Sequence, residues 1–284
     1  MCVVSLFNPL NAEAELLVKN GEKIAFLGDS ITAQGASSPS GYVWLVMSGL
    51  EANGVKATAI GAGIGGHKSN DMLKRLENDV LSKKPDWMTL SCGVNDVWHG
   101  EKGVPLEDYK KNITAIVERA QAAGVKVMIL TSTMIKEDQA NELNQKLAAY
   151  NEFLRGLAAE KKCALADLNA EMQEAVKAAA QVGKPKTNGN YLTADGVHMN
   201  PAGNQMMAQG VLKGFGLDAA QISKVNEGWQ DLPGAVEVGK IKVSLRQNAQ
   251  LEAIAAKEKR SVESVVNTEL ARTIDGLLKQ SSAK

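Results

Sequence analysis

Short apolar runs alternate with longer amphipathic segments along most of the chain. The runs lie at residues 23–27, 55–60, 87–92, 125–131 and 163–168, and each is followed by glycine or polar residues. Their length and almost uniformly apolar character predict buried β-strands.

Segments with helical spacing separate these runs, at residues 42–52, 70–81, 106–123, 139–161, 172–180 and 201–213. Asn53-Gly54 and Gly124 follow the first and third segments as helix-ending residues, and Pro201 suits the first turn of the last. Strands that alternate with helices predict an α/β domain with a parallel sheet covered on both faces. The right-handed crossover rule favours a three-layer α/β/α, flavodoxin-like doubly wound sheet of about five parallel strands.

Ligands of such sheets bind beyond the carboxyl ends of the strands. The first strand leads into Gly28-Asp29-Ser30, the second into the glycine-rich run from Gly61 to Gly66, and the third into Gly93-Val94-Asn95-Asp96. We expect these three segments to meet at one edge of the sheet.

Ser30 and His198 are candidates for nucleophilic catalysis. A serine hydroxyl needs a base to take its proton, and a histidine oriented by a carboxylate is the usual base. His198 is one of three histidines and stands three residues after Asp195. This spacing lets the carboxylate reach Nδ1 and leaves Nε2 free to face Ser30.

The reaction also needs donors for the oxyanion of its tetrahedral intermediate. Three candidates are the backbone N–H of Ser30, a backbone N–H of the glycine-rich loop at Gly66, and the side chain of Asn95. Glycine suits the second role because no Cβ obstructs the approach of a substrate. Gly65 is the alternative to Gly66.

Four blocks occur in order: Gly28-Asp29-Ser30-Ile31, Gly63-Ile64-Gly65-Gly66, Gly93-Val94-Asn95-Asp96 and Asp195-Gly196-Val197-His198. Together they resemble the blocks of the SGNH hydrolase superfamily, the GDSL-like lipases and acylhydrolases, over about residues 21–215. The resemblance implies a nucleophile at Ser30, oxyanion donors at Gly66 and Asn95, and a triad completed by Asp195 and His198. Ile31 replaces the leucine common in the first block. Gly61 replaces an asparagine common in the second, which removes a turn-stabilising side chain but leaves the backbone donor.

Other side chains near these blocks invite an interpretation. Asp29 and Asp96 are short carboxylates beside tight turns, where they commonly bind backbone N–H groups. His67 and His99 are candidates for lining the pocket. Trp98 is the stronger candidate for substrate binding, because an aromatic face suits a sugar ring or an apolar acyl group.

The bulk composition excludes several classes of protein. Thirty-two basic residues balance 32 acidic ones, so no overall charge favours nucleic acid or anionic lipid. No apolar run reaches the length of about 20 residues that spans a bilayer. Three cysteines without a CxxC pair and three scattered histidines are too few for a two-metal phosphoesterase, so we expect no metal or cofactor.

We expect three parts: an N-terminal segment at 1–20, a hydrolase domain at 21–216 and a C-terminal appendage at 217–284. Residues 2–7 are apolar, and Ala12-Glu13-Ala14 fits the A-x-A pattern of signal-peptide cleavage. This favours a secreted or periplasmic protein. The apolar stretch is short and no Lys or Arg precedes it, which leaves a cytoplasmic protein as the alternative.

In the appendage, Trp229, Pro233 and Gly234 mark a linker, 241–246 alternates as a strand does, and 251–259 and 262–278 have helical spacing. This order resembles a ribbon-helix-helix unit, whose DNA-facing residues would be Lys242, Ser244 and Arg246. Nine basic against six acidic residues over 236–284 are too mild a charge for a nucleic-acid binder. We therefore favour a helical hairpin that packs on the main domain or mediates a homo-oligomer.

We expect a serine esterase that cleaves a small-molecule or glycan ester through an acyl-enzyme and removes O-acetyl groups from a carbohydrate. A lysophospholipase or thioesterase is the alternative, although no long apolar stretch near the site would hold a fatty chain. A non-catalytic protein that binds DNA through its C-terminal unit is a third hypothesis, and the four intact blocks argue against it.

Overall fold

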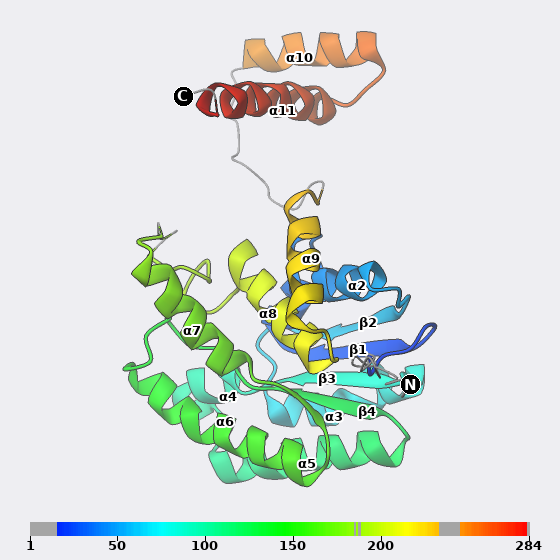
Figure 1. The fold of residues 1–284 in the computed structure, drawn as a ribbon, viewed down its shortest axis with the longest axis vertical. Coiled ribbons are helices and arrows are strands. Elements are labelled where there is room, and N and C mark those ends of the chain that lie inside the picture. Colours follow the sequence, from blue (N-terminus) through cyan, green and yellow to red (C-terminus); the bar gives the residue numbers. More distant parts are fainter. Residues whose placement is uncertain (1–15, 185, 187–188, 233–244, 283–284) are drawn as a thin grey trace, which may run out of the picture. The chain divides into compact units, whose positions relative to one another are not determined.

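The computed structural model describes residues 16–184, 186, 189–232 and 245–282. The chain forms two compact units, Met1–Val236 and Glu237–Lys284 (Figure 1). The N-terminal leader expected at 2–14 lies outside the described residues. So do Lys242 and Ser244 of the expected C-terminal strand.

The first unit contains a five-stranded parallel sheet in the order β2-β1-β3-β4-β5. The strands are β1 (Lys23–Gly28), β2 (Thr58–Gly63), β3 (Trp87–Ser91), β4 (Lys126–Leu130) and β5 (Ala164–Ala166). Gly28 pairs with Gly63, and Leu27 pairs with Leu90, so the carboxyl ends of the first three strands meet at one edge. The predicted doubly wound sheet is confirmed.

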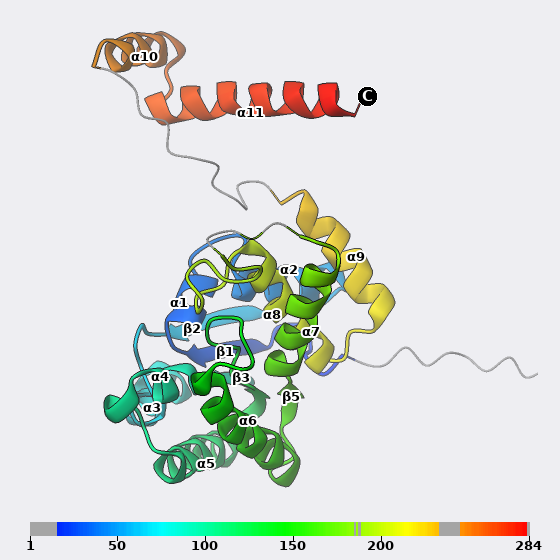
Figure 2. The same ribbon diagram turned by 90° about the vertical axis from the view of Figure 1, so that its left-hand side faces the viewer.

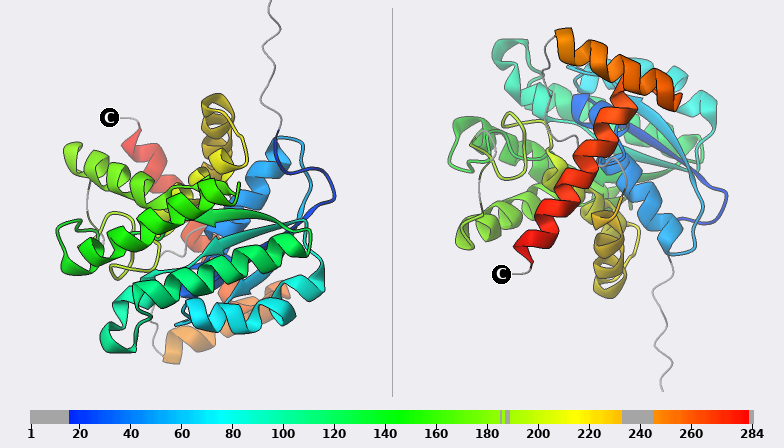
Figure 3. Two further views of the ribbon diagram at one scale, coloured as in Figure 1. Left: turned by 90° about the horizontal axis from the view of Figure 1, so that it is seen from below. Right: turned by 90° about the horizontal axis from the view of Figure 1, so that it is seen from above.

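Helices cover both faces of the sheet (Figure 2). One layer holds α2 (Tyr42–Ala52), α7 (Leu168–Gln181), α8 (Pro201–Gly214) and α9 (Ala219–Gln230). The other holds α3 (Ser69–Asp79), α5 (Leu106–Ala122) and α6 (Glu142–Glu160), which Figure 3 shows from below. The short helices are α1 (Ser30–Gly35), α4 (Val94–Trp98), η1 (Leu81–Lys83) and η2 (Gly100–Lys102).

The core lies on both faces of the central strands. Every residue of β3 is buried, and in β1 only Lys23 is exposed. Phe215, directly after α8, packs edge-on against Trp87 with ring centroids 5.3 Å apart. Aromatic contacts of this geometry stabilise beyond simple area burial. They fix α8, and with it the turn at residues 193–199 that precedes α8, against the sheet.

Strand β2 lies further along the chain than the apolar pattern predicts. It begins at Thr58 and continues to Gly63, whereas we expected a strand at 55–60. A Cβ on Gly63 would stand 2.3 Å from the backbone nitrogen of Ala33, so helix α1 can lie against this strand only if the position is glycine. A hydrophobicity pattern ends a strand at the first glycine and misses this extension.

The first unit also extends beyond the expected boundary near 217. Asp218 caps α9 by accepting from the N–H of Gln221 at 2.8 Å. Ile222, Val225 and Trp229 are buried, and the Trp229 indole donates to Ser48 Oγ of α2 at 3.0 Å. Residues 219–230, which were expected to belong to the appendage, therefore form a helix of the first unit. The boundary is corrected to Val236.

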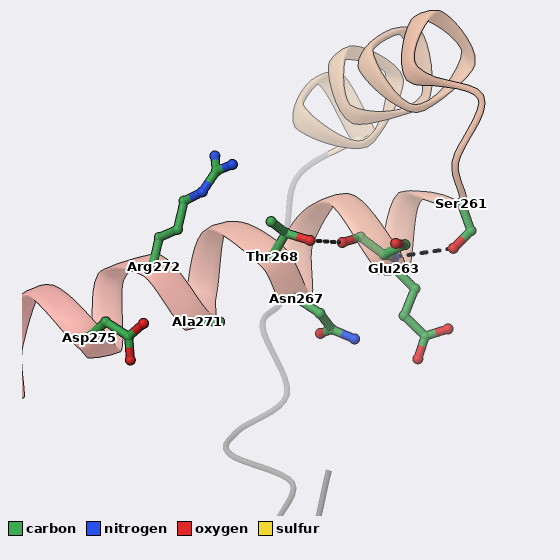
Figure 4. A pocket seen from close by; sticks show the side chains of 8 residues that line it. Ser261, Glu263, Asn267, Thr268, Ala271, Arg272 and Asp275 are labelled. Carbon is green, nitrogen blue, oxygen red and sulfur yellow. Dashed lines mark hydrogen bonds between the residues drawn. The ribbon is translucent and has the colours of Figure 1, made fainter. Parts of the chain in front are cut away.

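The second unit consists of α10 (Leu245–Glu258) and α11 (Val262–Ser281). Arg246, expected in a strand, lies in α10. Ser261 caps α11 by accepting from the N–H of Ser264 at 3.1 Å. A hollow of about 620 Å³ runs along α11 (Figure 4), but a single helix supplies its entire lining, so it is an open surface. None of the helices in the described residues is long and apolar enough to cross a membrane.

Candidate active site

The turn between β1 and α1 presents Ser30. Asp29 caps α1 through its Oδ1, which accepts from the N–H of Ile31 at 2.9 Å. A Cβ on Gly28 would stand 2.0 Å from Thr32 Oγ1, so the sharp strand-to-helix turn needs glycine there. Ser30 is the first residue of α1 and is partly exposed at the carboxyl edge of the sheet.

The sequence places Ser30 and His198 far apart, and the fold brings them together. His198 Nε2 lies 2.9 Å from Ser30 Oγ. On the other side of the ring, His198 Nδ1 lies 2.6 Å from Asp195 Oδ2. The carboxylate, imidazole and hydroxyl thus form one hydrogen-bonded chain. When Nδ1 carries the ring proton and donates a hydrogen bond to Asp195, Nε2 is free to accept the hydroxyl proton of Ser30.

Asp195 is held within its own turn and stays ionised. Its Oδ1 accepts from the N–H groups of Val197 at 2.9 Å and His198 at 2.8 Å. Partial burial opposes ionisation, but the hydrogen bonds from the His198 ring and from these two N–H groups outweigh it and lower the pKa of Asp195. A charged carboxylate can orient the ring and stabilise the imidazolium that forms when Ser30 loses its proton.

Backbone N–H groups beside Ser30 are free to bind an oxyanion. A Cβ on Gly65 would stand 3.8 Å from Ser30 Cβ, which puts this loop directly against the nucleophile. Gly66 has a φ of +75° and open space around it. Within the described part of the chain, the N–H groups of Ser30, Gly65 and Gly66 donate no hydrogen bond. Either glycine is thus available as a donor next to Ser30.

Asn95 connects the three segments at the edge of the sheet. Its Nδ2 donates to Asp29 Oδ2 at 3.3 Å and to the carbonyl O of His67 at 3.2 Å. Both distances lie at the long end of the normal range. The Asn95 amide thus crosslinks the first and second segments, and its N–H groups can be shared with an oxyanion beside them.

Two buried carboxylates support these turns. Burial raises the pKa of Asp29 to about 6, against the lowering effects of the Ile31 N–H and the nearby His198. Asp96 accepts from the N–H of Ser69, the first residue of α3, at 3.0 Å, and burial raises its pKa as well. Asp29 thus fixes the start of α1, and Asp96 fixes the start of α3.

Comparison with known proteins agrees with this geometry. The model of the GDSL-like lipase/acylhydrolase family matches residues 26–206. The protein belongs to this family. It is 27% identical over 222 residues to an acetylxylan esterase from Geobacillus stearothermophilus, a match that covers 71% of this chain and 97% of that one. It is also 27% identical to esterase TesA from Pseudomonas aeruginosa, over 51% of this chain and 69% of that one.

Solved structures lead to the same family. The acetylxylan esterase from Geobacillus stearothermophilus superposes with a TM-score of 0.63 at 26% identity, covering 72% of this chain and 98% of that one. The acetyl xylan esterase AlAXEase superposes with a TM-score of 0.61 at 35% identity, covering 67% and 98%. The prediction of an SGNH hydrolase is confirmed, and the protein is a carboxylic ester hydrolase.

The remaining expected side chains of this GDSL-like protein lie around the edge of the site. His67 Nδ1 accepts from Arg75 Nε at 3.1 Å, so its ring is held by the protein. Trp98, at the end of α4, is 39% exposed, and His99 follows it on the surface. In the described residues no hydrogen bond joins Trp98 or His99 to Ser30 or His198.

Arg75 of α3 is a residue of the site that the sequence analysis did not find. Its Nη2 donates to the carbonyl O of Gly28 at 2.7 Å, and its Nη1 donates to that of Ala62 at 2.8 Å and to Asp79 Oδ2 at 3.0 Å. Its side chain is only 10% exposed. The one signal was a basic residue beside Leu76 on the helix face that carries the buried residues.

The side chains at the site were compared with those that a metal ion needs. Among the described residues, no group of three or more His, Cys, Asp and Glu side chains is arranged to hold a metal ion. The groups that converge at the site are a hydroxyl, an imidazole, carboxylates and N–H donors. This set is suited to acyl transfer.

Proposed function

We propose that this esterase removes O-acetyl groups from a carbohydrate through an acyl-enzyme on Ser30. The observation that carries the proposal is the hydrogen-bonded chain from Asp195 through His198 to Ser30, with distances of 2.6 and 2.9 Å. Both links are within the range expected of a nucleophile, its base and the group that orients the base.

The proposed reaction has two halves. Ser30 Oγ attacks the ester carbonyl carbon while His198 Nε2 takes the hydroxyl proton, and collapse of the tetrahedral intermediate breaks the bond to the sugar oxygen. His198 returns its proton to that oxygen. A water molecule then attacks the acetyl-Ser30 carbonyl carbon and gives a proton to His198. The bond between the acyl carbon and Ser30 Oγ breaks, His198 returns the proton to Oγ, and acetate leaves.

The negative oxygen of both intermediates would be bound by the N–H of Ser30, the N–H of Gly66 or Gly65, and the amide of Asn95. Support comes from the unpaired state of these backbone donors beside Ser30. Each donor of this kind lowers the barrier by about 3–4 kcal/mol in other acyl-transfer enzymes.

The substrate class is inferred from the relatives and from the shape of the site. Two of the similar proteins are named as acetylxylan esterases, which act on acetyl groups of a polysaccharide. Turns and short helices bound the site, and the half-exposed Trp98 offers an aromatic face that suits a sugar ring. A lysophospholipase or thioesterase-type acyl hydrolase for longer chains is the second candidate, because the family also includes lipases and acylhydrolases.

Replacing the nucleophile tests the proposal. Ser30→Ala should abolish release of acetate from acetylated xylo-oligosaccharides, because Ser30 supplies the hydroxyl that is hydrogen-bonded to His198 Nε2. The thermal unfolding temperature should stay close to that of the wild type. Ser37→Ala is the matched control, since Ser37 Oγ is exposed and donates only to the carbonyl O of Gln34. Full activity of Ser30→Ala would refute the mechanism.

Acyl length separates the two substrate classes. We expect kcat/KM for nitrophenyl acetate to exceed that for nitrophenyl octanoate, and acetylated xylo-oligosaccharides to be deacetylated. Faster cleavage of the octanoate, with no acetate released from the glycan, would identify an acyl hydrolase of the second kind.

A further inference from the structure

The segment between β4 and α6 has no role in the site described above, yet its backbone is strained. Lys136 and Glu137 are consecutive non-glycine residues with φ of 60° and 49°. This left-handed conformation costs a non-glycine residue about 1–2 kcal/mol. Asn144 of α6, which is buried, holds the segment through donors to the carbonyl O of Ile135 at 2.7 Å and of Asp138 at 2.6 Å. Strain of this kind persists where the surroundings enforce it.

The strained backbone directs the Glu137 carboxylate at the chain just before the catalytic turn. Its Oε2 accepts from the N–H of Tyr191 at 2.7 Å. Its Oε1 accepts from the N–H of Leu192 at 2.8 Å and from both the N–H and the hydroxyl of Thr193 at 2.6 Å. Hydrogen bonds to a charged acceptor are about twice as strong as neutral ones.

Thr193 is the first residue of the catalytic turn, which comprises residues 193–199. It is fully buried and forms an antiparallel bridge with Met199, which closes the turn that carries Asp195 and His198. Inside this closure the N–H of Ala194 donates to the carbonyl O of His198 at 2.8 Å. The Thr193 hydroxyl also accepts from the N–H of Gly196 at 3.2 Å. Glu137 thus binds Thr193, the residue at which the catalytic turn begins.

Lys136 contacts the turn a second time, through its backbone. Its N–H donates to the carbonyl O of Gly196 at 2.6 Å. Gly196 has a φ of +95°, and a Cβ there would stand 3.3 Å from the Cα of Lys136. The two strained residues therefore bind the catalytic turn at two places: Glu137 at Thr193, and Lys136 at Gly196 between Asp195 and His198.

The turn behaves as one piece because Asp195 accepts from the backbone N–H of His198 as well as from its ring. A movement of the turn would leave the Asp195–His198 bond intact and change the 2.9 Å distance between His198 and Ser30. That distance joins two different parts of the fold, so an external support must set it.

We propose that Glu137 is a positioning residue for ester hydrolysis, which holds the catalytic turn so that His198 Nε2 stays in reach of Ser30 Oγ. This inference rests on the proposed roles of Ser30 and His198. Glu137 itself touches none of the reacting atoms, since its four hydrogen bonds all end on residues 191–193.

The test is Glu137→Gln, which keeps the size of the side chain but replaces one acceptor oxygen by an amide that cannot accept from N–H. We expect kcat to fall about 10- to 100-fold, since displacement of a catalytic group by about 1 Å can cost about 100-fold, while KM changes less than about twofold. The rate at which a fluorophosphonate labels Ser30 should fall by the same factor. Glu142→Gln, an exposed residue at the start of α6, is the matched control.

A second pair of variants separates positioning from folding. Thr193→Val removes one of the four donors and should lower kcat, whereas Thr193→Ser keeps the hydroxyl and should not. Wild-type kcat and labelling rate per folded molecule in both Glu137→Gln and Thr193→Val would overturn the proposal. So would a loss that matches the loss of folded protein, measured by near-UV circular dichroism. Ser30→Ala, assayed alongside, tests the proposed function separately.

Discussion

Two aspartates of the site illustrate how surroundings decide what a carboxylate does. The side chain of Asp195 is 55% exposed, and its hydrogen bonds keep its pKa low, so it remains charged beside His198. Asp29 is 3% exposed, and burial raises its pKa to about 6. Asp195 is therefore suited to stabilise an imidazolium, whereas Asp29 is charged at neutral pH only at a cost in stability.

The raised pKa of Asp29 predicts a pH-dependent stability. The folded state binds the Asp29 proton more tightly than the unfolded state, whose value is near 3.8. The contribution of Asp29 to the free energy of unfolding therefore falls as the pH rises through about 4 to 6, by at most about 3 kcal/mol. Asp29→Asn cannot ionise and still accepts from Ile31. Relative to the wild type, it should gain stability over this interval, measured by urea unfolding; a constant difference would contradict the expectation.

At this scale the sequence pointed to Ser30, Asp195 and His198, which the fold brings into one hydrogen-bonded chain, but not to the residues that hold them. Ser30 follows a strand, and Asp195 and His198 are close in sequence, so their chemistry is visible in the chain. Arg75 and Glu137 bind mostly backbone N–H and C=O groups. Every residue type has those groups, so no sequence pattern identifies such partners.

Among the elements, α3 ties together the ends of the two strands that flank the nucleophile. Arg75 reaches from the middle of α3 to the last residue of β1 and to the buried Ala62 of β2. It also holds His67 in the loop that carries Gly65 and Gly66. The Arg75 guanidinium of α3 thus helps to hold this loop, together with the amide of Asn95.

Arg75→Met should remove this link and take one donor from each of two partly buried carbonyl groups, of which that of Gly28 still accepts from the N–H of Ile64 at 3.2 Å. Loss of the partner of a buried acceptor costs about 1–3 kcal/mol, so we expect a loss of about that size in the free energy of unfolding, with a lower kcat. Urea unfolding and steady-state kinetics measure both effects. Arg119→Met, at an exposed position of α5, is the control. Equal stability of the two variants would show that the link is not needed.

Prediction of the elements succeeded where apolar residues are dense and failed where glycine or polar residues separate them. Helix α2 has the predicted bounds, and β1, β3 and α5 match within a residue. The end of β2 was not predicted, because its last residue is a glycine that the close packing of α1 requires. Helix α9 was missed because its buried residues, which are widely spaced among polar ones, were read as part of a linker.

For the whole molecule, the two units differ in how they are stabilised. The first unit has a continuous apolar core. In the second, Ala255 and Val265 are buried, whereas Leu277 and Leu278 of α11 are about 60% exposed.

Two truncations test this organisation. A chain ending at Val236 should keep the esterase activity and the unfolding temperature of the first unit. A chain ending at Gly216 loses α9, exposes the face of α2 that Trp229 covers, and should lose several kcal/mol of stability, since loss of a large buried side chain alone costs about 3–5 kcal/mol. Thermal unfolding of both proteins measures the difference. Equal unfolding temperatures would place the boundary near 217 after all.

The proposed nucleophile, Ser30, and its proposed base, His198, are separated by 168 positions in the chain. During synthesis at about 5–20 residues per second, the nucleophile leaves the ribosome on the order of ten to thirty seconds before the imidazole that activates it. A nascent chain therefore carries an ordinary, unreactive serine until the domain is nearly complete, and hydrolysis can begin only on a finished fold.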